Sequence, residues 1–205
     1  FGDNNEDLAT FEKEGRGFTD IKAWRRDNTY LFMKNLSHDL HDLKPYVKLG
    51  ISPFGIWGHS EETDGLGSNT PLTSQETYSH SVFADTRQWV KENLVDYVIP
   101  QIYWTKDNPA APYEEIATWW NDVVKGTNVN LYVGHGVFQL YESEEEAWTT
   151  TNPIKEQIAF NKTLDQIKGS AFFRFSYLVP EKPYFTGPGK EHLMAHSKDF
   201  KETYK

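Results

Sequence analysis

Four short runs of nearly continuous apolar residues divide the chain, and each run is followed by a segment with helical spacing. The runs cover residues 47–53, 96–103, 129–137 and 169–177. Apolar runs of this length, without strict alternation, are typical of parallel strands that are covered on both faces. The alternation of strand and helix therefore predicts an α/β protein with a parallel sheet.

The segments around these runs carry apolar residues at three- and four-residue steps, as amphipathic helices do. This spacing predicts helices over 21–44, 78–94, 113–125 and 154–164. Local signals for helix ends support each of them. These signals are Asp20 as an N-cap, Thr73 with Glu76 as a capping box, Gly126 after a helix end, and Asn152 with Pro153 at a helix start.

The links that follow strands are much longer than the links that precede them. They cover about residues 54–72, 104–112 and 138–151 and are rich in Trp, Tyr, His and acidic residues. Sites in α/β proteins form at the carboxyl ends of parallel strands, so this edge of the sheet is the expected location of function. The alternative is that these loops are tolerated insertions, because long surface loops cost little free energy.

Composition narrows the class of protein. The 205 residues are enough for one domain, and the formal net charge of -9 argues against a nucleic-acid partner and against docking on an anionic membrane. No apolar run is long enough to span a bilayer. The absence of cysteine excludes disulfides and thiol catalysis and is weakly consistent with a secreted bacterial protein. No glycine-rich phosphate loop or dinucleotide motif occurs, so we expect no cofactor.

Four parallel strands could form a small open sheet or half of an eight-stranded barrel. A long helix precedes the first strand, as though another strand had come before it, and this order favours the half-barrel. We expect a single partial domain over 1–205, with a leading loop at 1–20, a helix and four strand-helix units at 21–180, and a loop and helix at 181–205.

Several segments resemble the bacterial glycosyl hydrolase-like family 10. They are WRRDN at 24–28, LGISPFGIW at 49–57, ADTRQWVKENLVDYVIPQIYW at 84–104 and WW at 119–120, and the resemblance runs from about residue 10 to residue 177. It implies a (β/α)8 barrel in which the four strands of this chain are strands five to eight, the C-terminal half (β/α)4. The acidic, aromatic segment Asp-Asp-Tyr-Phe-Tyr-Pro, which ends the fourth strand in the family, is absent here.

The resemblance implies a glycoside hydrolase acting on O-glycosidic bonds of a polysaccharide or oligosaccharide, with bacterial cell-wall glycans as one candidate. Such hydrolysis normally needs two carboxyl groups about 5 to 9.5 Å apart. The predicted strand ends carry no acid, and acids occur only in the loops, where Asp107 lies nearest to a strand end. We therefore expect Asp107 as a candidate catalytic acid and at least one further acid outside this chain.

The strand ends and loops also carry residue types that bind sugars, because flat rings pack on sugar faces and planar polar groups bind hydroxyls. Arg174 between phenylalanines could instead form a structural ion pair, and His135 between glycines could be a hydrogen-bonded core histidine. The candidate substrate-binding residues are Trp57, His59, Gln101, Tyr103, Trp104, His135, Tyr141, Arg174 and Tyr177.

Two other functions stay open beside the glycosidase. The chain could be a non-catalytic glycan-binding fragment, or a metal-dependent hydrolase using His59, His80 or His135 with Asp107, although these residues lack close ligand spacing and we expect no metal. A half-barrel would expose sheet edges and an apolar face, so we expect self-association, such as a homo-dimer that pairs two halves. The resemblance implies an extracellular or cell-envelope location.

Overall fold

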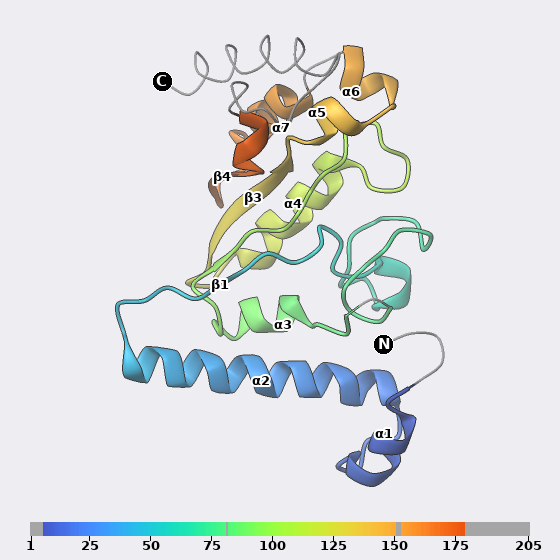
Figure 1. Cartoon of the computed structure of the whole chain (residues 1–205), viewed down its shortest axis with the longest axis vertical. Coiled ribbons are helices and arrows are strands. Elements are labelled where there is room, and N and C mark those ends of the chain that lie inside the picture. The colour runs from blue at the N-terminus through green and yellow to red at the C-terminus, as the bar shows by residue number, and fades with distance from the viewer. Residues whose placement is uncertain (1–5, 81, 151–152, 179–205) are drawn as a thin grey trace.

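The computed structural model describes residues 6–80, 82–150 and 153–178 (Figure 1). Four parallel strands form one sheet in the order β1-β2-β3-β4, which confirms the predicted α/β class and parallel sheet. The strands are β1 (Gly50–Ile51), β2 (Tyr97–Val98), β3 (Asn130–Gly136) and β4 (Ile167–Phe173). Isolated parallel bridges from Gln101 to Phe54 and to Gly134 continue the pairing beyond the short first two strands.

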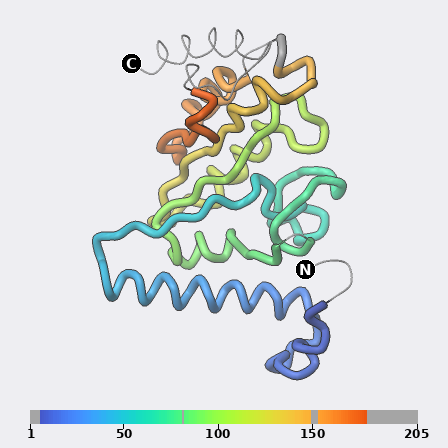
Figure 2. The backbone as a smooth tube through the Cα atoms, viewed as in Figure 1, coloured from blue at the N-terminus to red at the C-terminus, as the bar shows by residue number. Residues whose placement is uncertain are grey.

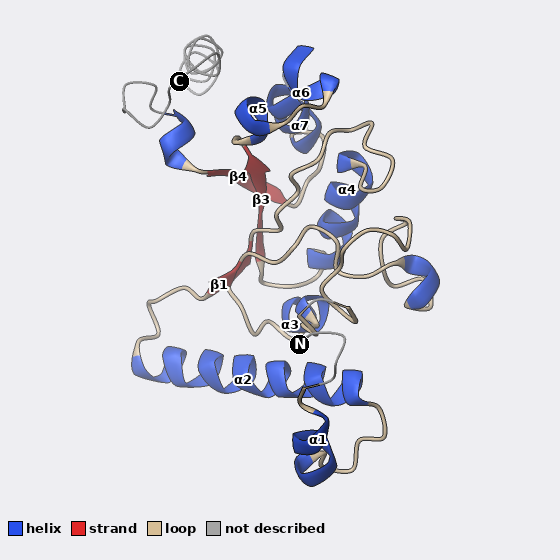
Figure 3. Cartoon of the chain, turned by 45° about the vertical axis from the view of Figure 1, so that its right-hand side comes forward, coloured by secondary structure: helices blue, strands red, loops and turns tan. Residues whose placement is uncertain are grey.

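The helices lie between and around these strands, and the backbone trace in Figure 2 follows their order. They are α1 (Leu8–Glu14), α2 (Ile21–Leu43), α3 (Thr86–Lys91), α4 (Tyr113–Val124), α5 (Gln139–Glu142), α6 (Glu146–Thr150) and α7 (Pro153–Asn161), with 3-10 turns η1 (Ser60–Glu62) and η2 (Phe175–Leu178). Figure 3 shows α3, α4 and α7 on one side of the sheet, with α2 beyond α3.

The predicted ends of three helices agree with the structure within a few residues. The Asp20 carboxylate accepts hydrogen bonds from the backbone N–H groups of Lys22 and Ala23, both at 3.0 Å, so it is the N-cap of α2. Gly126 follows α4 with φ of +77°, a conformation that glycine adopts without a steric penalty. Pro153 is the first residue of α7, whereas the predicted cap Asn152 and the predicted segment 181–205 lie outside the described residues.

The prediction of a helix over 78–94 was wrong in its first half, since α3 begins only at Thr86. The carboxylate of Glu76 accepts hydrogen bonds from the backbone N–H groups of Tyr78 and Ser79, which holds this segment in a turn. The helix starts instead at Asp85, whose carboxylate accepts the N–H of Gln88 at 2.9 Å. Asp85 thus provides the N-cap that was predicted at Thr73 and Glu76.

The leading segment 1–20 contains a helix, α1, rather than a loop alone. The rings of Phe11 and Trp24 lie 5.4 Å apart, and the indole N–H of Trp24 donates to the Glu14 carbonyl at 3.2 Å. The guanidinium of Arg25, only 5% exposed, forms an ion pair with Asp7. These contacts fasten α1 to the first turns of α2.

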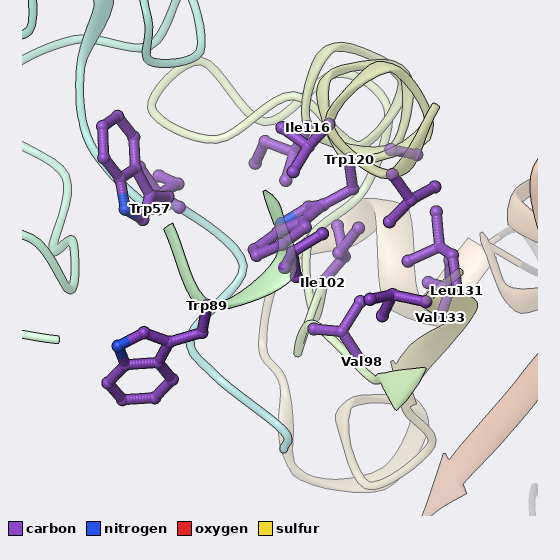
Figure 4. Packing of buried hydrophobic residues seen from close by; sticks show 14 of the residues in the cluster. Trp57, Trp89, Val98, Ile102, Ile116, Trp120, Leu131 and Val133 are labelled. Carbon is purple, nitrogen blue, oxygen red and sulfur yellow. The ribbon is translucent and has the colours of Figure 1, made fainter. Parts of the chain in front are cut away.

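The main core lies between the sheet and α4 (Figure 4). Four of its side chains are fully buried: Val98 of β2, Ile102 shortly after it, and Ile116 and Trp120 of α4. The Trp120 indole N–H also donates to the carbonyl of Gly55 at 2.7 Å, which ties α4 to the chain beyond β1. Because side chains alternate along a strand, residues 97, 99, 101 and 103 lie on the opposite face, which we call the far face of the sheet.

Candidate functional site

Five aromatic side chains form a continuous group at the carboxyl ends of β2, β3 and β4, and we call it the aromatic row. The Tyr103 ring stacks on Phe173, with centroids 6.1 Å apart, and meets the edge of Phe138 at 5.6 Å. Phe138 contacts Tyr177 at 6.5 Å, and Tyr177 stacks on Tyr141 at 5.5 Å with an interplanar angle of 10°. The row therefore joins three successive strand ends by ring contacts.

Polar groups lie around Tyr177 at one end of the aromatic row. The Tyr177 hydroxyl donates a hydrogen bond to the Glu142 carboxylate. The Arg174 guanidinium carbon lies 5.5 Å from the Tyr177 ring centroid, and its Nε donates to the Ser176 hydroxyl at 3.0 Å. This end of the row thus combines flat rings, a cation and a carboxylate, which are the groups that bind sugar rings and hydroxyls.

Arg174 is exposed, although its phenylalanine neighbours suggested burial. Those neighbours are themselves exposed, Phe173 by 52% and Phe175 by 69%. The end of β4 and the residues after it therefore expose both the guanidinium and two apolar rings.

Burial raises the pKa of the tyrosine hydroxyls in the row. This is the cause for Tyr103 and for Tyr141. For Tyr177, burial acts first and the neighbouring Glu142 carboxylate adds to it, so the pKa again lies above its usual range. All three phenols are therefore neutral at pH 7, and the Tyr177 hydroxyl is the hydrogen-bond donor to Glu142.

The structure brings four of the predicted substrate-binding residues together, namely Tyr103, Tyr141, Arg174 and Tyr177. Gln101 lies on the same far face, two residues before Tyr103, and its side-chain amide donates to the Ser52 carbonyl at 2.9 Å. Their common position comes from the parallel sheet, which aligns the carboxyl ends of neighbouring strands at one edge.

Trp57 and His59 lie in the interior of the long loop after β1. Trp57 is 2% exposed, stacks on Trp119 at 5.7 Å and donates its indole N–H to Asp85 at 3.0 Å. His59 is 1% exposed, with one ring nitrogen 2.9 Å from the Thr70 hydroxyl and the other 3.0 Å from the Ser74 carbonyl. Trp57 therefore ties the loop to α4 and to the start of α3, while His59 joins two parts of the loop, and neither side chain is accessible to a sugar.

Trp104 and His135 face the helix layer. Trp104 follows Tyr103 directly and so points to the opposite face, where it packs against the main core. His135 is fully buried, and its ring nitrogens lie 2.7 Å from the Gln157 side chain and 2.9 Å from the Ser170 hydroxyl. Burial lowers its pKa to about 4. These contacts are those expected of a hydrogen-bonded core histidine.

The acids of this edge lie in loops and short helices. Asp107, the predicted catalytic candidate, is exposed in the loop after β2. Glu142 is one of the loop acids that the sequence pattern did not single out, and Phe138 and Phe173 were not predicted as site residues either. Strand alternation could have identified Phe173 in the sequence, because it places this residue on the same face of β4 as residues 169 and 171.

Within 6–80, 82–150 and 153–178, no group of three or more His, Cys, Asp or Glu side chains could hold a metal ion. His80, one of the three histidines considered as metal ligands, pairs with the Glu76 carboxylate at 2.7 Å. No helix in this described part is both long and apolar enough to cross a membrane.

Comparison with known proteins agrees with the resemblance in the motifs. The profile of the family described as "Glycosyl hydrolase-like 10" matches residues 1–150. The chain is 38% identical over 173 residues to glycosyl hydrolase YngK of Bacillus subtilis, covering 84% of this chain and 33% of that protein. It is 37% identical over 182 residues to glycosyl hydrolase DigH of Escherichia coli K12, covering 86% of this chain and 40% of that protein. The chain thus spans about two fifths or less of the length of these relatives.

Proposed function

This chain belongs to the glycosyl hydrolase-like 10 family, and from that premise we propose that it is part of a glycosidase that hydrolyses O-glycosidic bonds of a polysaccharide by carboxylate acid-base catalysis. The observation that carries the proposal is the aromatic row at the carboxyl ends of the parallel strands. The exposed Phe173 ring and the half-buried rings beside it can pack on sugar faces, while Gln101 and Arg174 can bind hydroxyls. Bacterial cell-wall glycans are the substrate class that we favour.

We further propose that the four strands are strands five to eight of an eight-stranded barrel. The parallel order β1-β2-β3-β4 and the position of α3, α4 and α7 on one side of the sheet support this proposal. In such a barrel, the far face would line the interior and the aromatic row would lie at the mouth. The acid pair would then draw at least one member from outside this chain, with Asp107 as the first candidate inside it.

A hydrolysis assay on the full-length protein tests the proposal. Release of reducing ends from labelled oligosaccharides and from soluble cell-wall glycan should be detected for the wild type. Tyr103→Ala should lower kcat/KM by on the order of tenfold, because the ring packing it removes contributes about 1 kcal/mol. Tyr46→Ala is the matched control, since this exposed ring lies before β1, away from the strand carboxyl ends.

A non-catalytic glycan-binding fragment is the second candidate function. It is favoured by the strand ends themselves, which carry Gln101, Tyr103 and Arg174 but no acid. This alternative would be supported over the glycosidase if the chain is retained on immobilised glycan and neither it nor the full-length protein releases reducing ends.

The far face and the outer edge of β1 could also mediate association between copies. Tyr97, Ile99 and Tyr132 line an open cavity of about 490 Å³ on this face. We propose that the isolated chain buries this surface in a homo-dimer, which light scattering at micromolar concentration would detect, and a clean monomer would count against it. We also propose an extracellular or cell-envelope location, which cell fractionation would test.

A further inference from the structure

Glu142 is held by a rigid neighbour at the end of the aromatic row. It is the last residue of α5, and it accepts the hydrogen bond of the Tyr177 hydroxyl across 35 positions of sequence. Tyr177 is only 6% exposed and lies flat against Tyr141, with an interplanar angle of 10°. A carboxylate held by such a fixed donor has a defined orientation, whereas most loop acids do not.

Arg174, which also contacts Tyr177, adds a positive charge near Glu142. The Arg174 guanidinium lies over the Tyr177 ring and interacts with its hydroxyl. Tyr177 therefore contacts both a cation, Arg174, and the Glu142 carboxylate. The donated hydrogen bond fixes the direction of the carboxylate oxygen that receives it.

The position of Glu142 relative to the rings fits contact with a bound sugar. The Glu142 side chain is exposed, while its partner Tyr177 continues directly into Phe138 and Tyr103 of the aromatic row. A sugar packed on these rings would therefore lie beside a carboxylate of fixed orientation. Asp107 is exposed in a different loop, after β2.

We propose that Glu142 is the general base of the glycosidase and that Tyr177 is its positioning residue, an inference that rests on the proposed function. Glu142 takes a proton from a water molecule as the water oxygen bonds to the anomeric carbon. The glycosidic C–O bond breaks in the same step, and the departing oxygen takes a proton from a second carboxyl group, the general acid. The proton on Glu142 then returns through solvent to the general acid, so that both carboxyl groups are restored.

Kinetics of the full-length protein on labelled oligosaccharides and soluble cell-wall glycan test the catalytic role. Glu142→Gln should lower kcat on the order of 10²–10⁴-fold with little change in KM, as expected for loss of a general base. Formate should restore part of the activity to Glu142→Ala, and Tyr177→Phe should lose less kcat than Glu142→Gln. Glu145→Gln is the matched control, because Glu145 lies on the same loop, exposed, and should keep wild-type kcat.

A second measurement needs no substrate. The NMR signals of ring-labelled tyrosines, with Tyr177 assigned from Tyr177→Phe, should show a lower Tyr177 pKa in Glu142→Gln than in the wild type, because the neighbouring negative charge is gone. Glu145→Gln should leave that pKa unchanged. An unaltered Tyr177 titration in Glu142→Gln would overturn the proposed pair whatever the enzyme does.

The outcomes separate the two proposals. If the wild type cleaves a glycan and Glu142→Gln cleaves it equally well, the role of Glu142 is wrong and the glycosidase proposal stands. If the wild type cleaves none of these glycans, the proposed function fails and the role of Glu142 fails with it. A selective loss of kcat in Glu142→Gln, with formate rescue of Glu142→Ala, supports both.

Discussion

Acid should weaken the fold through His135 in particular. Its imidazole is fully buried between the Gln157 side chain and the Ser170 hydroxyl, and burial lowers its pKa to about 4. In the unfolded chain, the same group has a pKa of about 6.5. Between these values the unfolded state binds the proton and the folded state does not, so the free energy of unfolding falls as the pH falls.

The size of this effect follows from the two pKa values. A pKa near 4 in the folded state and near 6.5 in the unfolded state removes about 2 kcal/mol from the free energy of unfolding between pH 7 and pH 5. The loss approaches about 3 kcal/mol near pH 4 and then levels off. Near pH 7 the folded protein has lost almost none of this free energy of unfolding, since His135 is neutral in most molecules of both states.

Urea unfolding followed by tryptophan fluorescence, at a series of pH values, measures the effect. His135→Phe keeps a flat ring between Tyr113 and Phe172, so its stability should change less from pH 7 to pH 5 than that of the wild type. The variant will be less stable at pH 7, because Gln157 and Ser170 lose a partner, so each protein is compared with its own value at pH 7. His38→Gln is the control, since the His38 side chain is 72% exposed. Equal pH dependence in His135→Phe and the wild type would refute this account of His135.

Three further predictions concern the ends of the strands and the core. Asp96→Asn should cost about 1–3 kcal/mol at pH 7 because the carboxylate accepts bonds from the Leu49 N–H and the Lys48 ammonium. Burial alone would raise the Asp96 pKa, but the hydrogen bonds from these donors have the larger combined effect, so the pKa lies below its usual value. In urea unfolding, the stability difference between Asp96→Asn and the wild type should therefore disappear as the pH falls below about 4. Trp120→Phe should cost about 2–4 kcal/mol in the same assay, since it removes core volume and the bond to the Gly55 carbonyl; a loss under 1 kcal/mol would contradict the packing. Gly136→Ala would place a methyl carbon 3.0 Å from the Tyr103 ring, so it should displace the aromatic row and weaken glycan retention on an affinity column while the far-UV circular dichroism stays unchanged.

Local patterns were sufficient for the architecture. The four apolar runs predicted a parallel sheet, and each contains or overlaps one of the four strands found. Asp20, Gly126 and Pro153 mark helix ends through interactions with residues only a few positions away, which is why sequence alone located them. The long loops after strands likewise placed the candidate site at the carboxyl edge, because chain direction fixes which strand ends share an edge.

The same patterns were insufficient for the start of α3. Thr73 and Glu76 match a capping box, but Glu76 turns its carboxylate onto the N–H groups of Tyr78 and Ser79. Two competing caps, Glu76 and Asp85, lie within nine positions of one another. Only the packing of the loop after β1 decided which of them begins the helix.

Which aromatic and polar residues gather at the site depended on the tertiary structure. Tyr103 and Trp104 are neighbours in sequence, yet strand alternation sends one to the far face and the other to the core. Trp57, His59 and His135 have the chemistry of sugar-binding residues, but the folding of a long loop and the packing of α7 bury them. Sequence determined the alternating architecture and the edge that carries the site, since both follow from local periodicity and chain direction. The pairing of Glu142 in α5 with Tyr177 in η2, 35 positions away, was decided only by the tertiary structure, because contacts between distant segments leave no local pattern.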